Sequence, residues 1–218
     1  MLIGARQFFV TSKTMPLPYD AEVEYLESTG SQWIDTGITG RENMLVSCRL
    51  SANTANASNN FLVAADGGSS STRFWIVTPS SGIRCAAITS VNTIYSPLDA
   101  NWHDVSVDTT SGAKKAFVDG VLAWSDSGSS GAVETVQTLK LFARTAGTGT
   151  VNMGYGKLAS FSIKDTLSNL FLIDSIPVRF TNELGQSEGA MYDRVSGELF
   201  RNAGTDTFLY GNDIVGGS

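Results

Sequence analysis

The chain is poor in the residues that many catalytic and metal-binding sites require. It contains two cysteines and one histidine in 218 residues, too few for a disulfide framework and without the paired spacing of a zinc site. Its 15 Lys and Arg are outnumbered by 21 Asp and Glu, for a net charge of -6, and no basic stripe is present to neutralise a run of phosphates. We therefore expect no transition-metal centre and no nucleic-acid partner.

Long apolar runs are also missing. No segment approaches the ~18 consecutive apolar residues that a membrane-spanning helix needs, and residues 1–10 lack the charged start and unbroken apolar stretch of a secretion signal. We expect no membrane insertion and no signal peptide. For Cys48 and Cys85 two interpretations stay open, a single bridge or two buried reduced thiols, and buried thiols are the common state of cysteine outside disulfides.

Helical periodicity is nearly absent, whereas strand signals recur at short intervals between 22 glycines and many Ser, Thr and Asn residues. In residues 104–108 and 139–144, apolar residues occupy every second position, which predicts strands with one buried face. In the second segment the buried positions are 139, 141 and 143, so Phe142 is expected on the outer face. Residues 74–77 are apolar on both faces, which predicts a strand in the core. The pattern is typical of an all-β sandwich.

Residues 116–124 predict a hairpin, because Asp119 and Gly120 supply the two positive-φ positions of a type I′ turn. Polar and glycine-rich stretches at residues 51–60, 66–72 and 125–131 predict surface loops between strands.

The domain organisation follows from length and from the prolines. A chain of 218 residues fits one large sandwich, and no internal repeat or heptad pattern divides it. Pro16 and Pro18 forbid a regular central strand near the start. We therefore expect an extended N-terminal arm or linker over residues 1–20 and one sandwich domain over residues 21–218.

Three segments resemble a known family. Residues 102–107 (W-H-D-V-S-V), residues 116–120 (A-F-V-D-G) and residues 156–165 (G-K-L-A-S-F-S-I-K-D) are similar to the laminin G-like, concanavalin A-like sandwich, in which a W-H-x-V strand pairs with its neighbour through a V-D-G hairpin. The resemblance implies a two-sheet antiparallel jelly roll.

Two further segments resemble a subgroup of these sandwiches from gut-bacterial and phage proteins. Residues 24–37 match its E-Y-I-E-S-T-G-T-Q-Y-I-D-T-G opening, and residues 176–197 contain its Y-D-x-V-S-G closing. The resemblance covers residues 21 to about 211. It implies a concave face that relatives use for glycans or proteins, and it names no ligand.

Catalysis is the least supported class. Concanavalin A-like glycosidases carry an E-x-D-x-x-E strand motif, and Glu22 to Glu27 is superficially similar. A retaining glycosidase needs its two carboxyl groups about 5–5.5 Å apart, whereas residues 22 and 27 point to opposite faces of a regular strand. Glu24 also replaces the family's Asp, and His103, the one histidine, has no nucleophile elbow beside it. We expect no enzyme; a glycoside hydrolase is a distant third alternative.

Ligand-binding candidates are the tryptophans, because sugar rings offer apolar faces edged by hydroxyls. Each of the four, Trp33, Trp75, Trp102 and Trp124, can instead be a core residue. Trp75 beside a Gly/Ser loop, and Trp124 leading into Asp126, are selected as a rim site.

Calcium is the one cofactor that stays open, since loop carboxylate, amide and carbonyl oxygens suit it. Asp66, Asp99 and Asn101 are the candidate ligands. Turns recruit the same residue types for their own hydrogen bonds, so no cofactor is otherwise expected.

Two function classes follow from these observations. The first is a non-catalytic recognition or display module that binds a glycan or cell-surface ligand and is carried on a phage virion or an extracellular surface. The alternative is a purely structural decoration or assembly protein that docks on capsid or tail proteins through residues 1–20. A homo-oligomer is compatible with both. The sequence identifies neither the ligand nor the host.

Overall fold

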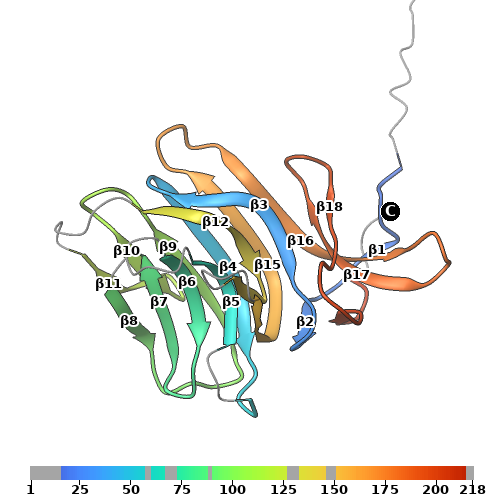
Figure 1. Ribbon diagram of the computed structural model, residues 1–218, viewed down its shortest axis with the longest axis horizontal. Coiled ribbons are helices and arrows are strands. Elements are labelled where there is room, and N and C mark those ends of the chain that lie inside the picture. Colours follow the sequence, from blue (N-terminus) through green and yellow to red (C-terminus); the bar gives the residue numbers. More distant parts are fainter. Residues whose placement is uncertain are drawn as a thin grey trace, which may run out of the picture.

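The computed structural model describes residues 16–56, 60–66, 73–87, 90–126, 133–145 and 151–214, apart from the side chains of residues 90 and 91. The secondary structure of these residues is β-strand throughout, arranged in sheets that lie face to face (Figure 1). Among the described residues no helix is present that could cross a membrane. The prediction of an all-β sandwich is confirmed.

The larger sheet has the order β11-β10-β9-β4-β15-β16-β17-β18, with β1 beside β16, β2 beside β15 and β19 beside β2. Its strands are β1 (Ala21–Glu22), β2 (Leu26–Thr29), β4 (Met44–Ala52), β9 (Trp102–Asp108), β10 (Lys115–Val118), β11 (Val121–Ser125), β15 (Tyr155–Asp165), β16 (Phe171–Thr181), β17 (Ser187–Asp193), β18 (Leu199–Phe200) and β19 (Leu209–Tyr210).

The second sheet has six strands in the order β3-β12-β5-β6-β7-β8. They are β3 (Ile34–Arg41), β5 (Asn60–Asp66), β6 (Arg73–Thr78), β7 (Ile83–Ala87), β8 (Ser90–Tyr95) and β12 (Glu134–Leu141); a separate pair is β13 (Ala143–Thr145) and β14 (Val151–Met153). Neighbouring strands in both sheets run antiparallel.

The core lies between the two sheets and is filled by every second side chain of each strand. On β9, Val105 and Val107 are buried while Asp104 is exposed, as the alternation predicts. On β6, Phe74 and Ile76 enter the same core. Because the side-chain period of a strand is two residues, the remaining positions of each strand form the outer faces of the sandwich, where ligands have access.

One prediction about this pattern is wrong. Phe142 was expected on the outer face of a continuous strand, but it is fully buried and its ring packs 5.3 Å from that of Phe208. The backbone at Phe142 has a positive φ of 60°, which interrupts the alternation between β12 and β13. Lys140, also expected on the outer face, is only 6% exposed.

The predicted hairpin is confirmed. β10 and β11 are joined by Asp119 and Gly120, with φ angles of 51° and 78°. The turn is also tied to β9, because Asp119 accepts a hydrogen bond from the backbone of Asp104 at 2.9 Å and contacts His103 Nδ1 at 2.8 Å. These contacts join the W-H-x-V strand physically to the V-D-G turn.

The opening and closing motifs of the resemblance form turns. After β2, the Oε1 atom of Gln32 accepts a hydrogen bond from the backbone of Thr29 at 2.8 Å, and its Nε2 donates to the carbonyl of Thr207 at 3.1 Å. After β17, Asp193 Oδ2 accepts from the hydroxyl of Ser196 at 2.7 Å. The polar residues of these two motifs therefore serve the fold.

The two cysteines are free and buried, which confirms the reduced interpretation. Cys48 lies on β4 and Cys85 on β7, so each sheet contributes one thiol to the core. Burial raises the pKa of both thiols to about 12.

Both described ends of the chain pack on the same part of the larger sheet. Asp20 donates its backbone N–H to Arg179 on β16 at 2.8 Å, while Val23 forms a bridge with Asp213, and Ile214 donates to the carbonyl of Glu22 at 2.8 Å. Residues 1–15, most of the predicted arm, lie outside the described residues.

Candidate functional site

The candidate site is built on a row of side chains that crosses five strands of the larger sheet. Trp102 on β9 lies opposite Ser51 on β4, Ser51 opposite Lys157 on β15, Lys157 opposite Glu27 on β2, and Glu27 opposite Leu209 on β19. Directly opposed residues share a face of a sheet. The next row in register, which includes His103 and Leu50, is buried, so the row of Trp102 faces outward.

An aromatic pair stands on this row. The ring of Tyr25, which precedes β2, lies 5.8 Å from that of Trp102 with an interplanar angle of 46°. Lys157 Nζ lies 4.4 Å from the centroid of the Tyr25 ring, within the range of a cation–π contact. Both rings are partly exposed. They offer an apolar surface beside charged and hydroxyl groups.

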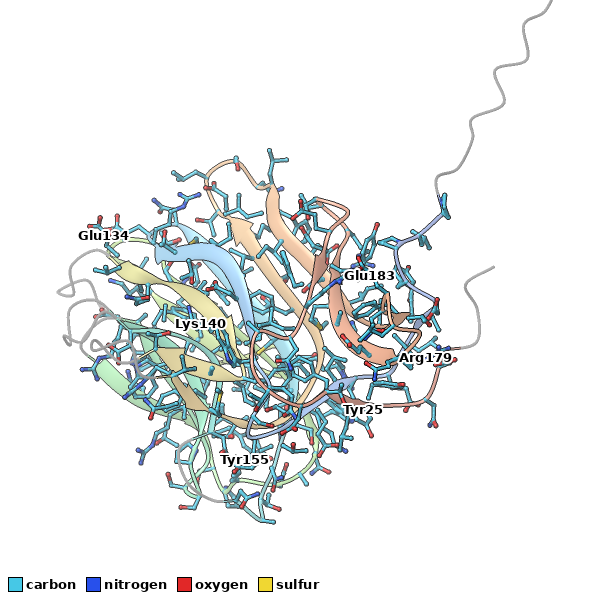
Figure 2. All side chains as sticks on the ribbon, turned by 45° about the vertical axis from the view of Figure 1, so that its right-hand side comes forward. Tyr25, Glu134, Lys140, Tyr155, Arg179 and Glu183 are labelled. Carbon is cyan, nitrogen blue, oxygen red and sulfur yellow. The ribbon has the colours of Figure 1, made fainter. Side chains whose placement is uncertain are left out.

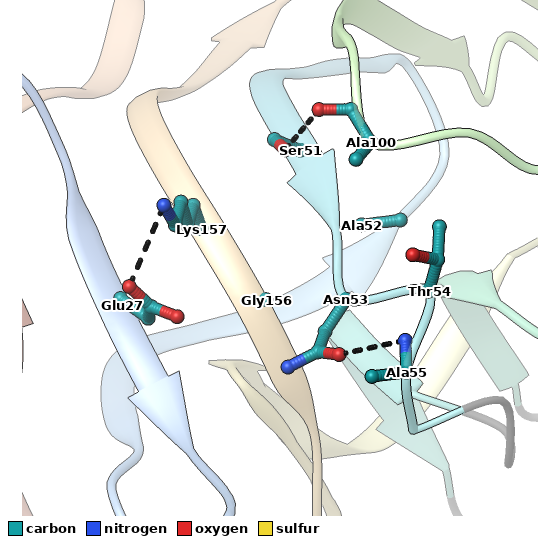
Figure 3. A pocket seen from close by; sticks show the side chains of 9 residues that line it. All are labelled: Glu27, Ser51, Ala52, Asn53, Thr54, Ala55, Ala100, Gly156 and Lys157. Carbon is teal, nitrogen blue, oxygen red and sulfur yellow. Dashed lines mark hydrogen bonds and ion pairs between the residues drawn. The ribbon is translucent and has the colours of Figure 1, made fainter.

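A hollow of about 250 Å³ opens next to the row, lined by Glu27, Ser51, Ala52, Asn53, Thr54, Ala55, Ala100, Gly156 and Lys157. Figure 3 shows Lys157 and Glu27 directed towards each other along one wall, with their charged atoms 3.6 Å apart. Across the hollow, Asn53 Oδ1 accepts a hydrogen bond from the backbone of Ala55 at 3.0 Å. This bond fixes the amide at the rim.

A second groove of about 440 Å³ continues from the same residues. It shares Tyr25 and Glu27 with the site and extends over Ser187, Thr207, Phe208, Leu209 and Tyr210. Figure 2 labels Tyr25, one of the residues that line this second groove. Glu27 lines both hollows, so the surface beside β2 offers aromatic, hydroxyl and charged groups.

Trp75, predicted as a ligand-binding residue, lies on the other sheet. It is on the outer face of β6, where its ring packs at an edge-on angle of 83° against Phe61, and it is partly buried. Its indole nitrogen is buried and has no hydrogen-bond partner. The structure does not bring Trp75 together with the row of Trp102.

Trp124 and Asp126, the other predicted ligand residues, lie at the edge of the larger sheet. Trp124 pairs with the buried Ala116 and packs against the core, while Asp126 donates its backbone N–H to the carbonyl of Lys114 at 2.8 Å. Trp124 is therefore partly buried against the core, and its role in ligand binding stays a prediction.

The predicted calcium ligands fall at two places. Asp66 ends β5 and its carboxylate lies 3.5 Å from Arg144, whereas Asp99 accepts hydrogen bonds from Tyr95 and from the backbone of Asn101, both at 2.9 Å. Hydrogen bonding to His103 and these donors lowers the pKa of Asp99 to about 2. Within the described ranges no group of three metal-ligating residues occurs, and calcium binding stays a prediction.

The acidic residues of the glycosidase-like motif have separate partners. Glu22 accepts a hydrogen bond from Tyr19 at 3.3 Å, Glu24 accepts two from Asn212 at 3.2 Å, and Glu27 pairs with Lys157. Glu22 and Glu27 belong to different strands, β1 and β2. The motif therefore does not form the pair of facing carboxyl groups that glycoside hydrolysis requires.

The arrangement of the sheets defines the class of fold, an antiparallel jelly-roll β-sandwich. A solved structure from Bacteroides ovatus, a protein to which carbohydrate binding is attributed, has this fold. It superposes with a TM-score of 0.52 at 13% sequence identity, over 89% of this chain and 61% of the other. The chain thus spans about three fifths of that protein, and the similarity establishes the fold alone.

A SAP-like heptameric pentraxin from Limulus polyphemus is more distant. It gives a TM-score of 0.41 at 12% identity, over 69% of this chain and 73% of the other, and supports no argument about function. No protein-family model matches the sequence, and a search of curated proteins finds no match.

Proposed function

We propose that the chain is a non-catalytic recognition module that binds a neutral glycan over Trp102 and Tyr25. The observation that carries the proposal is the row from Trp102 to Glu27, which places an aromatic pair, an ammonium and a carboxylate on one face. Ser51 lies between them in the row, is buried and donates its hydroxyl to the carbonyl of Ala100. Sugar rings have apolar faces that pack on aromatic rings and hydroxyl edges that need polar partners. The site supplies both.

The charges favour a neutral ligand. Lys157 is paired with Glu27, and on the same face Arg49 is paired with Asp104 at 3.1 Å, so these two positive groups are already compensated. The whole chain carries a net charge of -6, which repels acidic polysaccharides at long range. A neutral polysaccharide needs no unpaired positive group on this surface and is not repelled by the net negative charge.

A binding assay tests the proposal. We expect the wild-type chain to bind at least one neutral glycan on an array, and Trp102→Ala to weaken that binding about tenfold or more, because an aromatic platform contributes roughly 0.5–1.5 kcal/mol beyond its buried area. Tyr25→Ala should act in the same direction. Isothermal titration with the bound glycan measures both effects.

Trp75→Ala is the matched control, since it removes the same ring from the other sheet. Unchanged affinity of this variant, with weakened binding by Trp102→Ala, supports the proposed site. The reverse result would instead place the ligand on the six-stranded sheet, as the sequence suggested for Trp75. Carriage on a phage particle and docking through residues 1–20 stay predictions from the sequence.

A further inference from the structure

The outer face of the larger sheet has a second hollow, which the proposed site does not include. It measures about 290 Å³ and is lined by Ser47, Cys48, Asp104, Val105, Ser106, Gly120, Ser160 and Ser162. Three of these serines form a direct row across three strands, since Ser47 on β4 lies opposite Ser106 on β9 and opposite Ser162 on β15. All three are partly exposed.

An aromatic ring ends this row. Phe117 on β10 lies opposite Ser106 and, on its other side, opposite Leu122 on β11. Phe117 is partly exposed and Leu122 is 51% exposed. The serine row beside the second hollow thus resembles the row of Trp102, with an apolar ring at one end and polar side chains beside it.

The serine hydroxyls are available to a ligand. Among the described residues, Ser47, Ser106 and Ser162 make no side-chain hydrogen bond with another protein group, whereas Ser51 in the first hollow donates to the carbonyl of Ala100 at 2.9 Å. A hydroxyl offers one donor and two acceptor positions, which suits the hydroxyls of a sugar.

The two hollows lie in line on the same face. Trp102 and Ser106 are four residues apart on β9, and Ser51 and Ser47 are four apart on β4, so the two rows are separated by about 13 Å. Between them lie Asp104 and Arg49, which form an exposed ion pair, and Ser160, which lies opposite Arg49 on β15. A straight path therefore connects the rows along the strands.

We infer that the ligand is an extended oligosaccharide whose chain runs along β4 and β9, with one sugar on Trp102 and Tyr25 and a later sugar on Phe117 and the serine row. This inference rests on the proposed function and adds that the module reads a polymer along its length, and not only a terminal sugar.

Chain length is the variable that tests it. The probes are cello-, laminari-, manno- and xylo-oligosaccharides of one to six units, titrated calorimetrically. We expect affinity in the bound series to rise about tenfold or more between two and five units. Phe117→Ala should remove that rise and leave the affinity for the disaccharide unchanged, while Trp102→Ala should weaken binding at every length.

A double variant, Ser47→Ala with Ser106→Ala, keeps the test independent of any folding defect in Phe117→Ala, because small polar side chains on an outer face contribute little to stability. The double variant should also reduce the rise in affinity with oligosaccharide length. Leu184→Ala, at a residue that is 82% exposed in a distant turn, is the control and should bind as wild type.

The possible outcomes distinguish the extended binding path from the proposed site at Trp102 and Tyr25. If Trp102→Ala weakens binding and the Phe117 and serine variants keep the wild-type length dependence, the extended path is wrong and the proposed site stands. If affinity does not change beyond one or two units, the path is also wrong. If none of the four series binds and the array is silent, both proposals fail.

Discussion

His103 occupies an unusual position for a single residue, because both of its ring nitrogens face carboxylates. Nδ1 lies 2.8 Å from Asp119 and Nε2 lies 3.0 Å from Asp99, and the ring of Tyr95 packs 4.2 Å away. Burial alone would lower the pKa of His103, but the hydrogen bonds to Asp119 and Asp99 outweigh it and the pKa is raised. His103 thus joins the hairpin turn to the loop before β9 through both of its ring nitrogens.

The raised pKa predicts a pH-dependent stability. A histidine with a higher pKa in the folded state contributes stability that is complete below its unfolded pKa of about 6.5 and is lost as the pH rises through the folded value. We expect the free energy of unfolding to fall above about pH 6.5 in the wild type. His103→Gln, which has no titrating ring, should lack this fall and be less stable below it, by on the order of 1 kcal/mol.

Urea unfolding at about pH 6 and about pH 8 measures the free energy of unfolding of the wild type and of His103→Gln, below the pH at which the thiols ionise extensively in the unfolded state. If the free energy of unfolding of the wild type is equal at the two pH values, or falls by the same amount in His103→Gln, the stabilising effect of His103 protonation is contradicted. At the acid end, the pKa of Asp119 is lowered chiefly by its hydrogen bond to His103; that contribution is present above the unfolded pKa of Asp and is lost as the pH falls through the lower folded value.

At the scale of elements, the β10–β11 hairpin depends on its left-handed turn. Gly120 has a φ of 78° and no atom within 4 Å of the position of a Cβ. Gly120→Ala should therefore cost only the backbone strain of a left-handed residue, about 1–2 kcal/mol. Gly82→Ala is the comparison, because its Cβ would collide with the carbonyl oxygen of Tyr95.

We expect Gly82→Ala to be clearly more destabilising than Gly120→Ala, since backbone atoms on β8 must move to accommodate it. Thermal unfolding of the two variants beside the wild type measures the difference. Equal losses would show that the turn at Gly120 is constrained by more than its own conformation.

Elements with a strong local signal were predictable. Residues 104–108 alternate clearly, and the Asp-Gly pair specifies its own turn, so β9 and the β10–β11 hairpin follow from short stretches of sequence. The break at Phe142 did not follow, because a positive φ in an aromatic residue is imposed by tertiary packing, here against Phe208. Local periodicity could not anticipate it.

The candidate site was not predictable in the same way. The sequence leaves all four tryptophans open as core residues, and it favours Trp75 over Trp102 because Trp75 lies beside a Gly/Ser loop. The row of Trp102, Ser51, Lys157 and Glu27 assembles residues from four strands that are far apart in the chain. Strand register decides which of them meet, and register depends on the whole sheet. The alternation around Trp102 was the one local signal, since His103 and Val105 face inward.

The whole molecule is held by a core to which both sheets contribute a free cysteine. Cys48 and Cys85 are buried, and burial raises the pKa of each thiol to about 12. Because the thiolate is the reactive form, we expect neither to react with a chromogenic disulfide reagent in the native state.

Both thiols should become reactive together when the sandwich unfolds, and the absorbance of the released chromophore counts them. We expect two equivalents of chromophore per chain to be released at the rate of global unfolding. Rapid reaction of one thiol in native buffer would show that its sheet opens separately from the other.

The contact between Glu22 and Ile214 has a consequence for how such a domain can be joined to other chains. Since the strand that enters the sandwich and the segment that leaves it are hydrogen-bonded neighbours, a host protein could receive residues 16–214 within a single surface loop without stretching either connection. The same proximity permits the ends to be linked and the chain reopened at the exposed turn of Leu184, giving a circular permutant with the row of Trp102 intact.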